Sequence, residues 1–367
     1  MKAFIGRYLK VIDRYIIKKY LGTFVFTLML FIVISVVFDV SEHLDNFLGK
    51  NASMHDIIFN YYAGFIPFYM NYLSPLINFL AVIFFTAKMA NQTEIVPILT
   101  SKASFNRFLR PYFIAASIIF IVLFFANVYL IPYTNKLKIT FENANFFSGD
   151  DPTKSEVHIQ LDKQTFVYLQ SYDPQVHTGY NFMLEKFDGD ELKERITSTR
   201  ISFDSLKTRW KIVSPSTRKV NGLKESFIFN GPDIDTVLDM RPVDFVVHDN
   251  VYSAMSLTDL NKGIDKERTR GTGVLPDMLF EKYRRFVEPL AAYILAAIGV
   301  AISSRKVRGG VGLPLGIGIF ICFTYIVVNR FAFVFAIKGG FPPLLSVFIP
   351  NVTFGLLGYF LLIKAPK

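Results

Sequence analysis

The side chains that most often carry out catalysis or bind metals are few in this chain and stand far apart. The lone cysteine, Cys322, lies in an apolar run, and the glycine run that starts at Gly309 lacks the Gly-Lys-Ser/Thr ending of a nucleotide-binding loop. Neither a metal-ligand spacing nor a Ser/His/Asp set surrounds the histidines, which are His43, His55, His158, His177 and His248. We therefore expect no catalytic residue, no metal site and no cofactor in this chain.

One acidic residue stands out because of its neighbours. Glu94 lies in a short apolar-faced segment, Asn91–Thr100, within a polar stretch that carries four basic residues. Its carboxylate either offsets Lys88 or Lys102, or belongs to a coupling helix at residues 88–104 that docks into a motor protein on the cytoplasmic side. In the second case Glu94 pairs with an arginine of the motor, and the contact residues are Glu94, Ile95, Ile98 and Leu99.

Several basic residues lie beside or inside the apolar segments, where an anionic group at the membrane surface could bind them. Arg330 lies about two-thirds along an apolar segment, where an ionisable group costs a few kcal/mol unless it faces a cavity or a partner. A structural ion pair is the alternative for Arg330, and snorkelling at the membrane surface is the alternative for the others. The candidates are Lys136, Lys138, Arg284, Arg285 and Arg330.

Six apolar segments must position these side chains, and most are long enough to cross a bilayer as a helix. A basic amphipathic stretch, Met1–Tyr20, precedes the first span and is expected to lie on the membrane surface. The first span is too long for a signal peptide and should remain as an uncleaved anchor. The expected spans are Leu21–Val40, Asn71–Thr86, Tyr112–Ile131, Phe286–Ser304, a segment that follows Gly310 and ends near Ile337, and Leu344–Ile363.

A polar block lies between the third and fourth spans, with 21 acidic and 19 basic residues from Thr134 to Leu275. Short alternating runs separated by turn signals are typical of an antiparallel sandwich or jelly roll. The runs are Val157–Leu161, Ile196–Phe203, Trp210–Val213, Ser226–Phe229 and Val243–Val247, and Ser256–Arg270 is expected to be a helical linker. We predict six transmembrane helices, three plus three, with an inserted β-jelly-roll domain, divided into residues 1–133, 134–275 and 276–367.

The formal net charge of +10 comes from the apolar flanks, which hold 21 basic and 9 acidic residues. With the N-terminus inside, 15 basic residues fall in inner segments and 5 in short outer segments, which agrees with the positive-inside rule. Membrane anchoring therefore explains the basic excess better than nucleic-acid binding does. We expect both termini in the cytoplasm and the β domain outside it, in the periplasm of a cell with two membranes.

Several short motifs are similar in order and spacing to those of one transporter family. Gln92-Thr93-Glu94-Ile95-Val96, continuing to Ser104, resembles the coupling segment of the LptF/LptG (YjgP/YjgQ) lipopolysaccharide export permeases. Ile12-Asp13-Arg14-Tyr15-Ile16 resembles the opening of the LptG branch, so the chain is LptG-like more than LptF-like. Glu281–Phe286 with Pro289-Leu290, and then Arg308-Gly309-Gly310, resemble the second-half signature.

The chain also departs from the family pattern at some positions. Lys102-Ala103 and Pro97 are unusual in the coupling segment. Asp39 stands where some LptG-type members carry a lysine associated with lipid phosphate, which leaves the choice between LptF and LptG open. The three-span, β-domain, three-span layout nevertheless matches from end to end.

The resemblance implies a non-enzymatic permease subunit of the inner membrane that extracts lipopolysaccharide from the outer leaflet. It also implies an LptF/LptG-type partner permease, an LptB-type cytoplasmic ATPase dimer that uses ATP and Mg, and an LptC-type protein. The LptC-type protein would lead to a periplasmic bridge of the same β fold.

Energetics point to an external motor as well. Moving acyl chains into water costs about 0.8 kcal/mol per CH₂, and this chain has no nucleotide-binding loop, so a partner must supply the energy. The alternative is a membrane-anchored sensor or envelope assembly factor whose β domain binds a periplasmic ligand without an ATPase. A lipid-modifying membrane enzyme would need a clustered catalytic set, which the sequence lacks.

Overall fold

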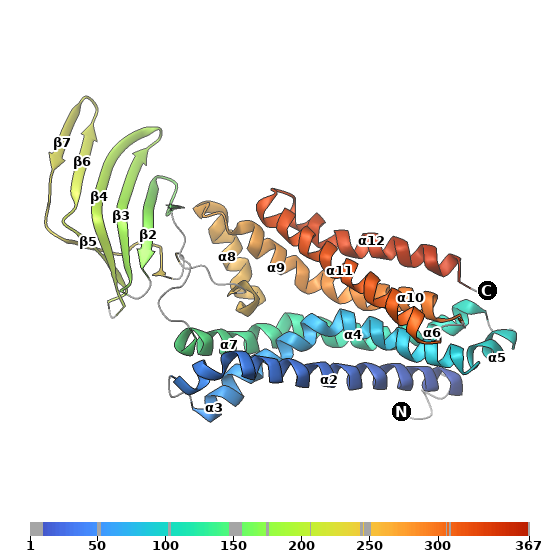
Figure 1. Cartoon of the computed structure of the whole chain (residues 1–367). Coiled ribbons are helices and arrows are strands. Elements are labelled where there is room, and N and C mark those ends of the chain that lie inside the picture. Colours follow the sequence, from blue (N-terminus) through green and yellow to red (C-terminus); the bar gives the residue numbers. More distant parts are fainter. Residues whose placement is uncertain are drawn as a thin grey trace. The chain divides into compact units, whose positions relative to one another are not determined.

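The computed structural model describes residues 10–49, 53–101, 104–146, 156–173, 176–205, 207–242, 245, 251–305, 307 and 310–365. The chain forms two compact units (Figure 1). The helical unit comprises Met1–Asn145, Ser253–Leu257 and Leu279–Lys367, and the β unit comprises Phe146–Tyr252 and Thr258–Met278. The β unit is therefore inserted into the sequence of the helical unit.

Six helical segments among the described residues are long and apolar enough to cross a membrane, as predicted. The first is α2 (Val11–Gly49), one continuous helix of 39 residues. The expectation of a separate surface helix before the first span is therefore wrong from Val11 onward. No proline interrupts the chain between the basic turns and the apolar turns, so they propagate as a single helix. The remainder of the expected surface helix, residues 1–9, lies outside the described residues.

The second and third spans each contain a π-helical turn. The second span runs through α3 (Met54–Asp56), the π turn η1 (Ile57–Tyr62) and α4 (Ala63–Asn91), with Pro67 and Pro75 inside α4. Neighbouring helices make such prolines tolerable within a membrane. The third span runs through α6 (Phe105–Phe125), the π turn η2 (Ala126–Leu130) and α7 (Ile131–Asn145). Both spans are longer than the sequence predicted.

The second half of the helical unit is built from shorter pieces. The 3₁₀ turn η4 (Val251–Ala254) leads back from the β unit. α9 (Leu275–Val287), the 3₁₀ turn η5 (Glu288–Leu290) and α10 (Ala291–Ser303) make the fourth span. The fifth and sixth spans are α11 (Gly312–Lys338) and α12 (Pro343–Ile363).

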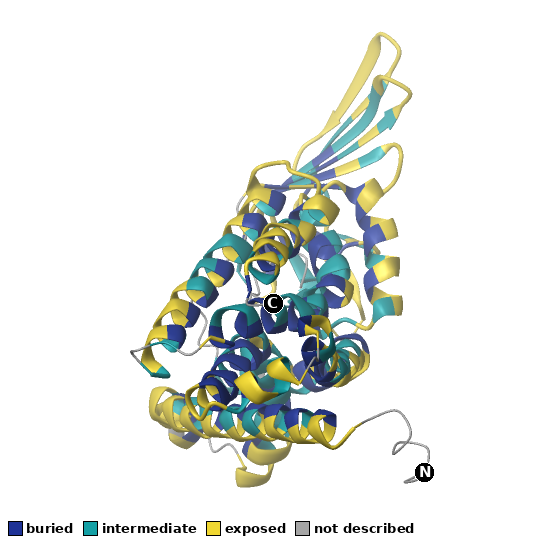
Figure 2. Cartoon of the chain, turned by 90° about the vertical axis from the view of Figure 1, so that its right-hand side faces the viewer, coloured by how far each residue is buried: buried dark blue, intermediate teal, exposed yellow. Residues whose placement is uncertain are grey.

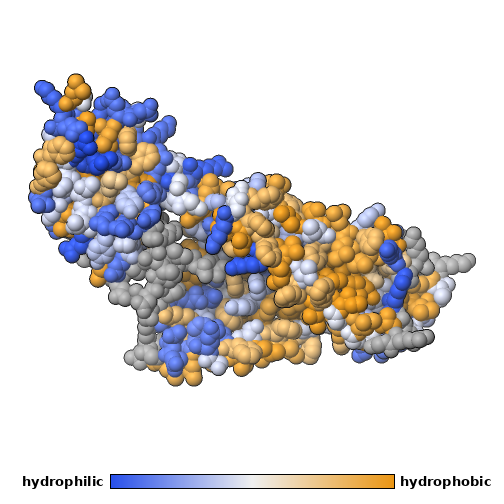
Figure 3. All heavy atoms as spheres, turned by 45° about the horizontal axis from the view of Figure 1, so that its top comes forward, coloured by the Kyte–Doolittle hydropathy of each residue, from blue (hydrophilic) through white to orange (hydrophobic). Residues whose placement is uncertain are grey.

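The spans differ in how much of their apolar surface the fold covers. In the most apolar 18 residues of each span, 67% are buried in the span that contains α4 and 61% in the span that contains α10. The corresponding shares are only 17% for α2 and 22% for α11. Exposed residues follow the outward faces of the helices (Figure 2), and hydrophobic residues cover much of the helical surface (Figure 3). Lipid, a partner or cargo must therefore cover α2 and α11.

A buried asparagine ties three spans together. Asn78 of α4 is 0% exposed, accepts a hydrogen bond from the Tyr20 hydroxyl of α2, and donates to the Ala292 carbonyl oxygen of α10 at 3.1 Å. Polar side chains that pair in this way stabilise helix contacts where the hydrophobic effect is weak.

A buried carboxylate fastens the far end of α2. Asp39 is 6% exposed, and its two oxygens accept hydrogen bonds from the Tyr61 and Tyr62 hydroxyls of η1 at 2.7 and 2.9 Å. His43 lies one turn further along α2, with Nδ1 3.3 Å from the same carboxylate.

The β unit contains one antiparallel sheet of eight strands in its described residues. Neighbouring strands pair in the order β1-β2-β3-β4-β5-β8, and β6 joins β4 to β7. Alternate residues such as Ile159, Val167, Leu184 and Trp210 point into a buried apolar core. The strands are β1 (Val157–Gln160), β2 (Thr165–Asp173), β3 (Thr178–Asp188), β4 (Glu191–Asp204), β5 (Arg209–Val213), β6 (Ser216–Asn221), β7 (Lys224–Ile228) and β8 (Ile234–Thr236).

The predicted fold class, membrane helices with an inserted antiparallel β domain, is confirmed. The linker helix is α8 (Leu257–Arg270), close to its expected bounds. The strand expected over Val243–Val247 lies outside the described residues except for Phe245, which is buried in the core of the β unit.

The close crossing of α4 and α7 gives a test of the helical packing. A Cβ at Gly64 would overlap the Thr134 carbonyl oxygen and the Lys138 Cβ, so Gly64→Ala should destabilise the protein by about 1–3 kcal/mol through overpacking. Thermal unfolding of the full chain in detergent measures the effect. Gly355→Ala is the matched control, because nothing lies within 4 Å of a Cβ placed there. Equal unfolding midpoints for the two variants would contradict this packing.

Candidate coupling segment and cargo-binding surface

The predicted coupling segment contains a short helix, α5 (Ile95–Thr100), that is anchored on the helical core. Ile95 is 2% exposed and joins the same buried apolar cluster as Ile16 of α2, while Ile98 and Leu99 pack partly against that cluster. The exposed side of the segment is formed instead by Gln92, Thr93, Val96, Pro97 and Thr100. Of the predicted contact residues, Ile95 therefore holds α5 in place rather than facing a partner.

Glu94 precedes α5 and is partly exposed. Its Oε2 accepts a hydrogen bond from the Tyr15 hydroxyl of α2 at 3.0 Å. Within the part of the chain that the structure describes, the carboxylate makes no ion pair with lysine or arginine, and Lys102 lies outside that part. Glu94 is therefore held near α2 while one side remains open to a partner.

Arg285 of α9 is buried and engaged within the fold. It is 2% exposed, lies 3.1 Å from Glu281 Oε1, and donates to the carbonyl oxygens of Met255 and Ser253 at 2.8 and 3.3 Å. The Asn135 side chain of α7 also bonds to the Ser253 hydroxyl. Arg285 thus fastens the returning segment to the helical unit, and a lipid phosphate would have to displace these bonds to reach it.

The other predicted basic residues occupy different environments. Lys138 lies 3.3 Å from Glu142 and over the ring of Phe68, with its side chain only 15% exposed. Arg284 donates to Glu281 Oε2 at 2.7 Å and keeps 32% of its side chain exposed. Lys136 is exposed. Acidic side chains therefore already bind Lys138 and Arg284, whereas Lys136 lies at the surface.

Arg330 is exposed among apolar residues of a membrane-spanning helix. It lies on α11 with its guanidinium 5.0 Å from the centre of the Phe333 ring. Apolar residues such as Phe331 and Phe335 are exposed on the same helix. An arginine in such surroundings requires a cavity, a headgroup or a partner beside it.

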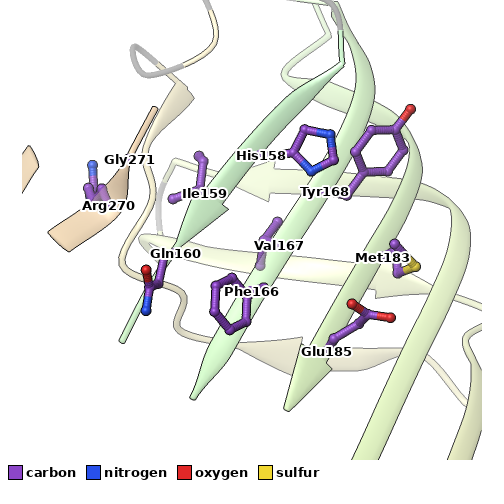
Figure 4. Close-up of a pocket in the computed structure, with 10 residues that line it drawn as sticks. All are labelled: His158, Ile159, Gln160, Phe166, Val167, Tyr168, Met183, Glu185, Arg270 and Gly271. Carbon is purple, nitrogen blue, oxygen red and sulfur yellow. The ribbon is translucent and has the colours of Figure 1, made fainter. Parts of the chain in front are cut away.

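The β unit carries a hollow of about 240 Å³ that sequence reasoning did not identify (Figure 4). Two cross-strand rows on the sheet face opposite the core line it. His158 pairs with Tyr168 and then Met183, and Gln160 pairs with Phe166 and then Glu185. Arg270 and Gly271, at the end of α8, also line the hollow. The alternation predicts that Val157 and Ile159 face the core, as they do, but Phe166 and Tyr168, expected to face inward as well, lie on the opposite face with His158 and Gln160. The sequence did not predict that α8 borders them.

The edge strand β7 is exposed, and its C-terminal end carries exposed apolar residues. Among the described strands, β7 pairs only with β6, and all of its residues are exposed. Phe227 and Phe229 lie with nearly parallel rings 6.0 Å apart. Such an edge can accept another strand through main-chain hydrogen bonds. Among the described residues, no group of three His, Cys, Asp or Glu side chains could hold a metal ion.

The two neighbouring arginines of α9 give a matched test. Arg285→Ala removes a partner of Glu281 and the donor to two carbonyl oxygens. We therefore expect a stability loss of about 3–5 kcal/mol. Arg284→Ala removes one partly exposed bond to the same Glu281 and should cost clearly less. Unfolding of each full-length variant in detergent provides the comparison, and a larger loss for Arg284→Ala would show that Arg285 has no structural role.

Comparison with known proteins adds independent information about this arrangement. A search of curated proteins finds no match for the chain. The sequence profile of the family described as "Lipopolysaccharide export system permease LptF/LptG" matches residues 14–364, nearly the whole chain. The match covers both halves of the helical unit and the β unit between them. The chain therefore belongs to the LptF/LptG family of lipopolysaccharide export permeases.

Proposed function

We propose that this multi-pass membrane protein is the transmembrane subunit of an ATP-driven lipopolysaccharide exporter. It extracts lipopolysaccharide from the outer leaflet of the inner membrane and passes it to a periplasmic β-jelly-roll bridge. The observation that carries this proposal is a short exposed segment, Gln92–Thr100, whose helix is anchored on the helical core through Ile95. A force applied there reaches the spans directly.

Energy enters at this segment from an LptB-type ATPase dimer, which holds ATP and Mg. Val96 is 54% exposed and Pro97 is exposed beside it, so they present a small apolar surface to the motor. Glu94 supplies the charge for an arginine of the motor, with which a carboxylate forms a strong hydrogen-bonded pair. The arginine of the motor then either replaces the Tyr15 hydroxyl at the Glu94 carboxylate or binds beside it.

The partner permease and the cargo cover α2 and α11, the two least buried spans. With an LptF/LptG-type partner, these faces enclose a lateral cavity that admits acyl chains from the bilayer. Phosphate groups of the lipid meet Arg330, Arg284 and Lys136, which remain at least partly exposed. We leave Arg285 and Lys138 out of this set because their side chains are only 2% and 15% exposed and other groups of the chain bind them.

The β unit receives the acyl chains on the periplasmic side. Its exposed edge strand β7 offers main-chain groups to the β fold of an LptC-type bridge protein. Both termini lie in the cytoplasm under this proposal, which agrees with the distribution of basic residues.

Charge reversal tests the coupling role. Glu94→Lys should abolish lipopolysaccharide export by the reconstituted complex while the chain remains in the membrane, because a lysine repels the arginine of the motor. Export is measured as lipid released from proteoliposomes per ATP hydrolysed. Lys88→Glu, a reversal on the same side of the membrane, is the control. Export at the unaltered rate with Glu94→Lys would refute the coupling role.

Purification distinguishes the exporter from a membrane-anchored sensor. The unaltered chain should copurify with a nucleotide-binding subunit in mild detergent, because a transporter without its motor has no energy source. A sensor or assembly factor would copurify without such a subunit.

Photo-crosslinking tests the proposed cavity. A photoreactive residue in place of Phe331, beside Arg330 and 59% exposed, should capture lipopolysaccharide or the partner permease. The same residue in place of Leu356 on α12, 66% exposed, should capture mainly phospholipid. Equal lipopolysaccharide capture at the two positions would argue against a cavity at α11.

A further inference from the structure

We propose that Asp13, Arg107 and Tyr15 form a latch that makes α2 move together with the coupling helix α5. The inference rests on the proposed function and adds a transmission step: the stroke received at α5 passes to α2. Asp13 and Arg107 are positioning residues in this step, and neither needs to touch the motor or the cargo.

Other residues of this chain bind both oxygens of the buried Asp13 carboxylate. Asp13 is 1% exposed, and its carboxylate receives two parallel hydrogen bonds from Arg107, at 2.7 Å from Nη1 to Oδ1 and 2.6 Å from Nη2 to Oδ2. Oδ2 also accepts from the Lys10 backbone amide at 2.8 Å, which caps the start of α2. A bidentate pair of this kind fixes both the distance and the orientation of the two helices.

The pair of Asp13 and Arg107 is formed directly after the coupling segment, because Arg107 follows that segment in the sequence. Arg107 lies in the first turn of α6, where its backbone amide donates to the Ser104 side chain that caps the helix. Glu94 lies directly before α5 and receives the Tyr15 hydroxyl. Two residues of the first turns of α2, Asp13 and Tyr15, are therefore bonded to the two ends of one segment, residues 94–107.

An apolar contact also joins α2 to α5. Ile16 of α2 and Ile95 of α5 are 0% and 2% exposed and belong to one buried cluster. Further along, only 17% of the most apolar part of α2 is buried. Of the six spans, α2 is the least buried, and it is firmly joined to the coupling segment at one end. Displacement of α5 therefore tilts or shifts α2 and moves its exposed apolar face.

Breaking the pair should uncouple hydrolysis from export. In the reconstituted complex with its ATPase and partner permease, Arg107→Ala should keep ATP hydrolysis but lower the lipid exported per ATP by roughly 5- to 150-fold, the usual range of coupling between sites. Arg110→Ala is the matched control, since Arg110 is an exposed arginine one turn further on that acts on Asp13 through its charge and not through a hydrogen bond. It should lower this ratio far less than Arg107→Ala does. The exchange D13R/R107D should restore part of the export if the pair acts through its mutual bond.

Crosslinking tests whether a fixed link between α2 and α6 can take the place of the ion pair. Cysteines at positions 13 and 107, placed in a Cys322→Ala background and joined by a short bismaleimide, should preserve export, because the latch stays closed throughout the cycle. Loss of export on joining them would overturn the proposal, as would an unchanged ratio of export to hydrolysis in Arg107→Ala. Failure of the unaltered complex to export lipid with ATP would instead refute the proposed function itself.

Discussion

A polar group that leaves water must find a partner inside the fold, and this constraint decides how the helical unit is assembled. Asn78 meets it by joining three spans. Asp13 accepts hydrogen bonds from both terminal nitrogens of Arg107, and Arg285 binds Glu281 and two carbonyl oxygens. These paired polar groups hold the helices of the unit together. Arg330, exposed over a phenylalanine ring on α11, instead marks the surface where the helical unit meets another molecule.

Much of the architecture could be predicted because length and hydropathy decide it. A helix needs about 20 apolar residues to cross a bilayer, so six spans and an inserted β domain followed from the sequence, and the coupling segment stood out by its isolated carboxylate. The helix ends were less predictable. The basic turns before Leu21 continue α2 without a break, and nothing in the residue types of Ile57–Tyr62 announces a π turn.

The roles of single charges were the hardest to predict, since hydropathy places a residue along the membrane normal but not around the helix. Arg284 and Arg285 are adjacent and were equivalent as lipid ligands, yet successive helical residues point about 100° apart, and only Arg285 faces the returning segment. Hydropathy also does not show which side of α5 a residue faces. Ile95 was expected at a partner surface, but it lies in the core. The hollow beside β1 also depends on α8, which is distant in sequence.

The π turn η1 brings two consecutive tyrosines, Tyr61 and Tyr62, onto the single carboxylate of Asp39. In a regular α-helix their side chains would diverge more widely, because each residue there turns by about 100°. The end of α2 remote from the coupling segment is therefore held by two hydroxyl groups from neighbouring positions of one turn, so the loss of one hydroxyl would leave the other bond in place.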